Sequence, residues 1–349
     1  MPAPELKISN KIVKFRKAIT TPEFTSKHII TNDHFSFVDL WMKRNCADAL
    51  PFWTQAKNYY YASKNLPTES APLTSYYCML NAAKALLTAK GVEFSPYHGV
   101  TGDCDDSSRI NTSNEYIKFK GGGVIVSLSQ YLGDEEENIN HNLNDLLGNL
   151  PYIHRSYCFT NKIKSELFIP IHDPKYRIHP NKDINKVWWS ANVDKMYCDG
   201  RILKYLQPKY NFHTTESGEC EITTKKRIKW HSPSCQDEDI KFSHQKLNEF
   251  HKTLRIDISV ISGFQDSWYL KRCVTRFINI KRHGLVISML IMHRLSEISR
   301  YNPDRMLKYL NGKENWLINE FVRASIVQFI DEISCEITSL ELKRPKAAS

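Results

Sequence analysis

The spacing of apolar residues along the chain predicts five helices. The segments with helical spacing cover residues 51–63, 74–90, 237–254, 285–299 and 314–340. In the second of them, Tyr76, Leu80 and Leu87 fall on one face, and Gly91 follows at a position where glycine commonly ends a helix. The fourth is apolar on nearly all sides, so we expect that helix to be buried on most sides.

A different pattern occupies residues 100–230, where short alternating or β-branched runs are separated by polar, turn-rich stretches. The runs that predict strands are 124–128, 167–171 and 221–228, followed by 256–261 and 268–280. We therefore expect an α+β protein, mainly α, in which a β-containing insertion divides a helical bundle. The expected organisation is an N-terminal extension at 1–40, a composite helical core at 41–100 and 235–342, the insertion at 101–234 and a disordered tail at 343–349.

Four local patterns resemble the YaaC-like family of bacterial proteins. They are Pro72-Leu73 followed by Ser75-Tyr76-Tyr77, the run LNAAKALL from Leu80 to Leu87, Tyr97-His98-Gly99, and Leu295-Ser296 followed by Arg300-Tyr301-Asn302-Pro303. The first three also resemble the opening helix pair of the HEPN superfamily. The family resemblance implies that residues 40–100 and 235–340 form one helical bundle. The HEPN likeness implies a homodimer and a role in stress or phage defence.

Charge favours a polyanionic partner. The chain of 349 residues has 48 Lys and Arg against 38 Asp and Glu, and residues 201–349 hold 25 of the former and 17 of the latter. A basic surface attracts RNA by releasing its counterions, although the same charge can serve only solvation. No run reaches the roughly 18 apolar residues of a membrane span, and the N-terminus lacks a signal-peptide core, so we expect a cytoplasmic protein.

Basic residues alternate with aromatic ones in two of the strand-like regions, around Trp230 and around Trp268-Tyr269. On a strand, alternate residues share a face, so cations there can follow a phosphate backbone while rings stack on bases. The candidate nucleic-acid-binding residues are Lys225, Lys226, Arg227, Lys229, Lys271, Arg272, Arg276, Lys281 and Arg282. The alternative is that these charges protect an edge strand against aggregation.

Catalytic candidates are few. HEPN ribonucleases carry an arginine and then a histidine on one helix with four to six residues between them. The only match is Arg276 with His283, which have six residues between them in a predicted strand and turn. A second hypothesis places His98, Arg300 and Tyr301 in one cleft where they hold a phosphate, with Lys84 nearby, although Arg300 also suits a helix C-terminus.

Signals for metals and cofactors are weak. A zinc site drawn from His213, Cys220, His231 and Cys235 fits no common zinc-finger spacing. The nine cysteines include no CxxC pair, which indicates reduced thiols. Asp103, Asp105 and Asp106 are typical of a polar turn rather than a divalent-cation loop.

Nucleotide-binding signals are also missing. No GxxxxGK[ST] loop occurs, and the run Gly121-Gly122-Gly123 lacks the predicted strand-loop-helix setting of a nucleotide site. We therefore expect no cofactor. Three hypotheses stay open: a binder of RNA or another phosphate-bearing ligand, a metal-independent ribonuclease, and a non-catalytic subunit that packs on a partner protein.

Overall fold

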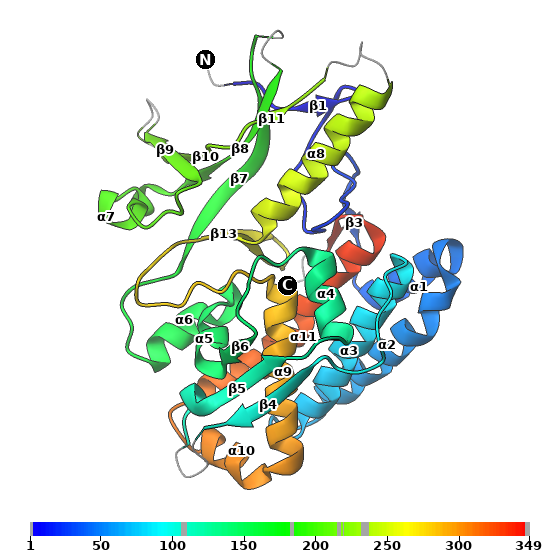
Figure 1. Cartoon of the computed structure of the whole chain (residues 1–349), viewed down its shortest axis with the longest axis vertical. Helices are drawn as coiled ribbons and strands as arrows, with labels where there is room; N and C mark the ends of the chain where they lie inside the picture. The colour runs from blue at the N-terminus through cyan, green and yellow to red at the C-terminus, as the bar shows by residue number, and fades with distance from the viewer. Residues whose placement is uncertain are drawn as a thin grey trace.

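The computed structural model describes residues 3–105, 110–181, 185–214, 218, 220–231 and 237–345. Its elements form a mostly helical part, at the bottom of Figure 1, and a part built on one large antiparallel sheet, at the top. This arrangement confirms the predicted class, α+β and mainly α. Within the described residues, no helix combines the length and the apolar character that a membrane crossing requires.

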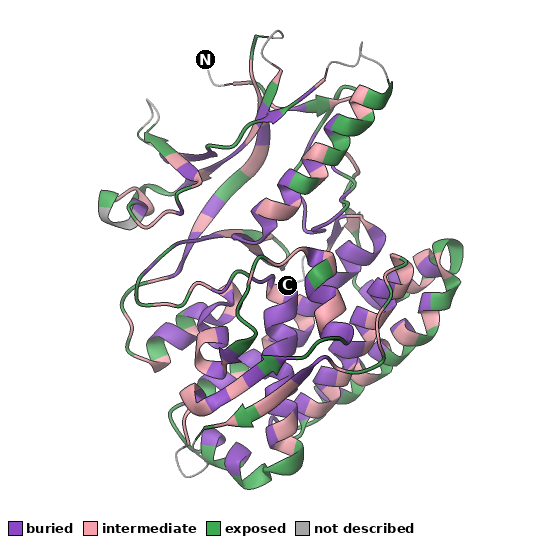
Figure 2. Cartoon of the chain, in the orientation of Figure 1, coloured by how far each residue is buried: buried purple, intermediate pink, exposed green. Residues whose placement is uncertain are grey.

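The helical part surrounds α9, which is buried along most of its length. Its helices are α1 (His34–Asn45), α2 (Leu50–Lys64), α3 (Ala71–Ala89), α4 (Val124–Leu132), α5 (Leu143–Gly148), α6 (Pro151–Thr160), α9 (Gly284–Tyr301), α10 (Pro303–Leu310) and α11 (Asn315–Thr338). A small sheet of β4 (Val100–Cys104), β5 (Glu115–Phe119) and β6 (Asn140–Asn142) covers one side. Figure 2 shows α9 and α11 as largely buried helices, as their apolar patterns predict.

The large sheet has the strand order β12-β13-β7-β8-β10-β9, and each neighbouring pair is antiparallel. Its strands are β7 (Phe168–Ile178), β8 (Lys186–Val193), β9 (Tyr210–Thr214), β10 (Cys220–Thr224), β11 (Ile228–Lys229), β12 (Ile258–Ile261) and β13 (Ser267–Lys271), with α7 (Gly200–Leu203) beside them. Helix α8 (Asp237–Arg255) lies along one face (Figure 1), where its Leu247, Phe250 and Leu254 share a core with Trp189 of β8.

Short elements complete the chain. They are β1 (Lys7–Ile8), β2 (Lys11–Ile12), β3 (Ile29–Ile30), β14 (Leu342–Lys343) and the 3-10 helices at Ala47–Ala49, Thr112–Asn114 and Lys195–Tyr197. Because β14 pairs with β3, Lys343 belongs to the folded structure rather than to a disordered tail. Residues 346–349 lie outside the described residues.

One predicted strand is wrong: residues 124–128 form the first half of α4. Val124, Ile125, Leu128 and Leu132 are fully buried, which is the spacing of one helix face. A short apolar run fits a buried strand or a buried helix face equally well, so the local pattern did not distinguish them.

The two hydrophobic cores do not divide at residue 101, where the insertion was expected to begin. Leu143, Leu150 and Ile153 belong to the helical core, whereas Phe15 and Phe24 of the expected N-terminal extension belong to the core of the sheet. The N-terminal segment and residues 143–153 are therefore integral parts of the two cores.

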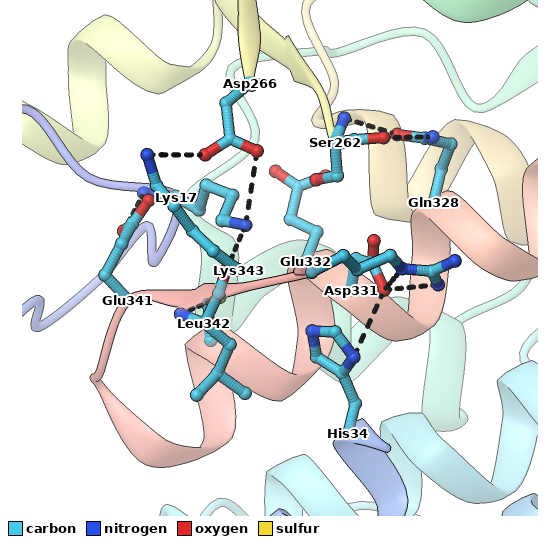
Figure 3. Close-up of polar contacts among 12 residues, drawn as sticks. Lys17, His34, Ser262, Asp266, Gln328, Asp331, Glu332, Glu341, Leu342 and Lys343 are labelled. Atoms are coloured by element: carbon cyan, nitrogen blue, oxygen red, sulfur yellow. Dashed lines mark hydrogen bonds and ion pairs between the residues drawn. The ribbon is translucent and has the colours of Figure 1, made fainter. Parts of the chain in front are cut away.

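Buried charges join the two parts (Figure 3). The ammonium of Lys17 lies 3.5 Å from Asp266 Oδ1, and that of Lys343 lies 3.6 Å from Asp266 Oδ2. Nearby, Asp331 of α11 is 3.6 Å from His34 Nδ1 and 2.8 Å from an Arg344 nitrogen. Each charge has an opposite partner, which is the condition for burying it without a large penalty.

Candidate functional site

His98 lies on the loop between α3 and β4, next to two aromatic side chains. A hydrogen bond of 2.5 Å joins its Nδ1 to the Tyr76 hydroxyl of α3, and the two rings stack with centroids 5.3 Å apart. The His293 ring of α9 lies 5.7 Å from the His98 ring, edge to face. The sequence motifs around Tyr76 and His98 therefore meet in space.

Both imidazoles are neutral near pH 7. Burial lowers the pKa of His293 to about 4. Burial, followed by the positive charge of Lys84, lowers the pKa of half-buried His98. A neutral imidazole can accept a proton, which is the first requirement for a general base.

The glycine run positions the His98 loop. Val124 N donates to Tyr97 O at 2.9 Å and Ile125 N donates to His98 O at 3.1 Å, so the first amides of α4 hold the loop. Gly123 has φ +133°, and a Cβ there would lie 2.4 Å from the Gly99 Cα. The run does lie between a strand, β5, and a helix, α4, contrary to expectation. The helix amides that follow it, those of Val124 and Ile125, bind carbonyl groups of the His98 loop.

A buried carboxylate, Glu115, binds the arginine that follows His293 on α9. Glu115 is fully buried; its Oε2 accepts from Arg294 Nε at 2.8 Å and Nη2 at 2.6 Å. Its Oε1 accepts from Arg305 Nε at 2.5 Å and from the Tyr309 hydroxyl at 2.9 Å. This network ties β5 to α9 and α10, because each helix supplies a guanidinium to one carboxylate.

His293 and Glu297 are site residues that the sequence analysis missed. Buried His293 Nδ1 has no hydrogen bond and lies 3.8 Å from Glu297 Oε2. Glu297 also accepts from Arg294 Nη1 at 3.0 Å and from Gly102 N at 3.2 Å. A histidine beside a carboxylate can be stabilised as an imidazolium during proton transfer. The sequence did contain an indication of this site, because the polar pair His293-Arg294 interrupts a helix that is otherwise apolar.

The structure does not bring His98 together with Arg300 and Tyr301. Arg300 is exposed, and its guanidinium lies 5.0 Å from the centroid of the Tyr301 ring, itself 65% exposed. Seven residues separate Arg300 from His293, the α9 residue that contacts His98, which is about 10 Å along a helix. These two side chains therefore mark the end of α9.

His283 has the environment of a core residue. It is 2% exposed, its Nε2 lies 3.0 Å from Leu132 O, and its amide donates to Asp134. Burial lowers its pKa to about 3. Arg276, its partner in the predicted ribonuclease spacing, is exposed on the segment before α9. This enclosure does not suit the catalytic role considered for His283.

Three of the predicted nucleic-acid-binding residues are buried, so the expectation that they form an exposed surface needs correction. Lys271 donates to Ile280 O at 2.6 Å, and Arg272 donates to Glu166 O. Arg282 donates to the Ser129 hydroxyl at 2.9 Å and to His141 at 3.2 Å. The aliphatic parts of these side chains are buried, and their charged ends bind polar groups inside the protein. Arg276 and Lys281 are exposed.

The other four predicted residues form an exposed basic surface beside the first residues of β8, Lys186 and Val187. Thr223 pairs with Ser190, and Ile228 pairs with Val187. The chain therefore advances five residues from β10 to β11 while β8 advances only three. The two extra residues make a β-bulge, a feature that redirects side chains out of a sheet. We call the exposed residues here the basic bulge: Lys186, Lys225, Lys226, Arg227 and Lys229.

The basic bulge concentrates like charge. Lys186 and Lys229 are direct partners on neighbouring antiparallel strands, a placement that destabilises a sheet. The Arg227 guanidinium lies 4.4 Å from the centroid of the Trp188 ring. A hydrogen bond from Lys246 lowers the pKa of Glu249 most, and the charge of Lys226 makes a smaller contribution in the same direction, so one carboxylate lies close to this surface.

The proposed zinc ligands do not converge. His213 pairs with Glu221 across β9 and β10, so their side chains share one face of the sheet. Cys220 is the neighbour of Glu221 on β10, and successive side chains of a strand point to opposite faces, so His213 and Cys220 lie on opposite faces. His231 Nδ1 lies 3.0 Å from the Ser243 hydroxyl. Cys235, like Asp106 of the acidic turn, lies outside the described residues. Among the residues that are described, no three His, Cys, Asp or Glu side chains are grouped as metal ligands.

The family model described as YaaC-like Protein matches residues 13–337, nearly the whole chain. Searches of curated proteins and of solved structures found no match.

Proposed function

The chain belongs to the YaaC-like protein family, and from this premise we propose that it binds RNA through the basic bulge. The observation that supports the proposal is the exposed cationic loop itself. Lys225, Lys226 and Arg227 project from a bulge, and Lys186 opposes Lys229 at its base. Such repulsion costs stability in the free protein, and phosphate groups would relieve it.

An aromatic group at the same place favours a nucleic acid over a simple anion. The Trp188 ring lies beneath Arg227 and is partly exposed. Single strands are bound by cations that follow the backbone together with rings on which bases stack. We therefore propose single-stranded RNA as the ligand, with the cations bound to phosphates and a base near Trp188.

The test is fluorescence anisotropy of a labelled single-stranded RNA over a salt series. The variant Lys225→Gln/Lys226→Gln removes two cations from the bulge. Losing two phosphate contacts reduces the slope of log K against log salt by about 1.4, so the affinity ratio between 50 and 200 mM salt shrinks roughly seven-fold.

The control is Lys43→Gln/Lys313→Gln, which removes the same charge from two exposed lysines elsewhere, 60% and 62% exposed. We expect it to keep the parent slope. Equal losses in both variants would mean that net charge alone acts. A parent protein that retains no RNA at low salt would refute the proposal.

A second candidate function is metal-independent cleavage of RNA, which the paired histidines favour. In this reaction one imidazole takes the proton of a ribose 2′-hydroxyl, and the 2′-oxygen attacks phosphorus. The bond to the 5′-oxygen breaks, and the imidazolium that formed when the first imidazole took the 2′-proton gives this proton to the 5′-oxygen. Among the described residues, no protein group hydrogen-bonds His98 Nε2, which would suit it to contact a substrate.

Cleavage is tested with the same labelled RNA on a denaturing gel. We expect His98→Gln and His293→Gln to lose cleavage and to keep RNA retention. His172→Gln, which changes an exposed histidine, should leave both unchanged. Retention of intact RNA by the parent under all conditions would exclude this candidate and keep the binder.

The biological setting that we propose is stress or phage defence, by the likeness to HEPN proteins. Plaque counts on cells with and without the gene test it. If the chain instead packs on a partner protein, complex formation should depend little on salt. A homodimer also stays a prediction, which mass photometry of the purified protein checks.

A further inference from the structure

A pocket of about 390 Å³ lies at the other end of β7, away from the basic bulge. Lys164 and Glu166 reach it from the segment between α6 and β7, and Arg272 reaches it from the residue after β13. Tyr197, Asp199 and Tyr205 line the remaining side from the chain around α7. Its volume falls within the range of about 300–1,000 Å³ that small-molecule sites occupy.

Positive charge exceeds negative charge in and around this pocket. Arg272 is 5% exposed, and it donates to Glu166 O. Arg155 of α6 lies alongside, 3.4 Å from Glu166 Oε1, and Lys204 lies 4.8 Å from the centroid of the Tyr205 ring. The lining itself holds two cations, Lys164 and Arg272, and two carboxylates, Glu166 and Asp199. Arg155 and Lys204 lie beside the lining and give its surroundings two more positive charges. The expected ligand is therefore anionic.

Two tyrosines give the pocket an aromatic character as well. The Tyr197 hydroxyl accepts from Arg155 Nη2 at 3.0 Å, which fixes its ring beside the cations. The backbone carbonyl of Tyr205 accepts a hydrogen bond from Cys273 N at 2.8 Å, which links the backbone of this second tyrosine to the segment that carries Arg272. An aromatic ring beside guanidinium groups suits a ligand that has both a flat base and a phosphate.

We propose that this pocket binds a nucleotide, with the base against Tyr205 or Tyr197 and the phosphate toward Arg272 and Lys164. The ligand is either a free nucleotide or a nucleotide of an RNA chain. The proposal goes beyond RNA binding at the basic bulge, because β7 (Phe168–Ile178) separates the two places by roughly 30 Å at the rise of a strand.

Saturation-transfer NMR with adenosine, guanosine, cytidine and uridine 5′-monophosphates tests the site, with adenosine and inorganic phosphate as partial ligands. We expect at least one monophosphate to bind more tightly than either partial ligand. Tyr205→Leu should weaken it at least about five-fold, the size of one stacking contact. Lys164→Gln should weaken it as well, and both side chains are exposed enough to be changed without opening the core.

The control variants separate this inference from RNA binding at the bulge. Tyr301→Leu, a change at an exposed tyrosine, and Lys225→Gln/Lys226→Gln should both keep nucleotide binding. Displacement of the nucleotide by a short RNA would identify the RNA chain as the source, and RNA binding without displacement would identify free nucleotide. Absence of monophosphate binding, or equal binding to Tyr205→Leu and the parent, would overturn the inference whatever the RNA result.

Discussion

Replacing Glu115 by glutamine should strongly destabilise the protein. The side chain is fully buried and accepts four hydrogen bonds from Arg294, Arg305 and Tyr309. The amide keeps the shape and removes the charge, which leaves two guanidinium groups, 7% and 9% exposed, without that counter-charge. Breaking a buried pair in this way costs about 3–5 kcal/mol.

The lower half of that range applies here, because Glu297 stays paired with Arg294 at 3.0 Å. With each kcal/mol moving the midpoint by about 2 °C in a large chain, Glu115→Gln should lower Tm by roughly 6–8 °C. Thermal unfolding followed by circular dichroism measures the shift.

Two further variants make the measurement specific. Tyr309→Phe removes one hydrogen bond of 2.9 Å to the carboxylate and should cost less, about 1.5–3 kcal/mol. Glu69→Gln changes an exposed carboxylate and should stay within about 0.5 kcal/mol of the parent. If Glu115→Gln shifts Tm no more than Glu69→Gln does, the account of Glu115 as the carboxylate that ties β5 to α9 and α10 is wrong.

Two more outcomes are expected from the same structure. Burial lowers the pKa of His154 to about 4, and its Nε2 accepts a hydrogen bond from Leu167 N at 2.8 Å. Because the pKa of an unfolded histidine is about 6.5, the neutral ring contributes about 3 kcal/mol to the free energy of unfolding above pH 6.5, and this contribution is lost as pH falls toward 4. The acid dependence of Tm should therefore flatten in His154→Gln. Gly123→Ala should lower Tm through its φ of +133° and the approach to Gly99, whereas Gly121→Ala, with open space at its Cβ, should not; equal midpoints would contradict the role given to Gly123.

Long periodic segments could be predicted from the sequence because their burial follows one repeat. The apolar stripes of α2, α3, α9 and α11 each exceed three turns, so helical spacing is distinct from strand spacing. The run that became α4 is shorter, and its type depends on the surface that it covers. Local pattern carries no information about that surface.

Side-chain environment was harder to predict than secondary structure. Lys226 and Lys271 occur in similar basic and aromatic stretches, yet Lys226 projects from a bulge and Lys271 turns inward to Ile280 O. The difference depends on which segment packs over each strand. His98 and His293 meet although about 200 residues separate them, so no local spacing could have indicated the pair.

RNA photo-crosslinking tests the central claim most directly. Labelled single-stranded RNA is irradiated with the whole protein, and the crosslinked peptides are mapped by mass spectrometry. RNA binding at the basic bulge predicts crosslinks to Trp188 and to the segment 225–230, with a marked decrease in Lys225→Gln/Lys226→Gln. Crosslinks confined to other surfaces and unchanged in that variant would contradict it.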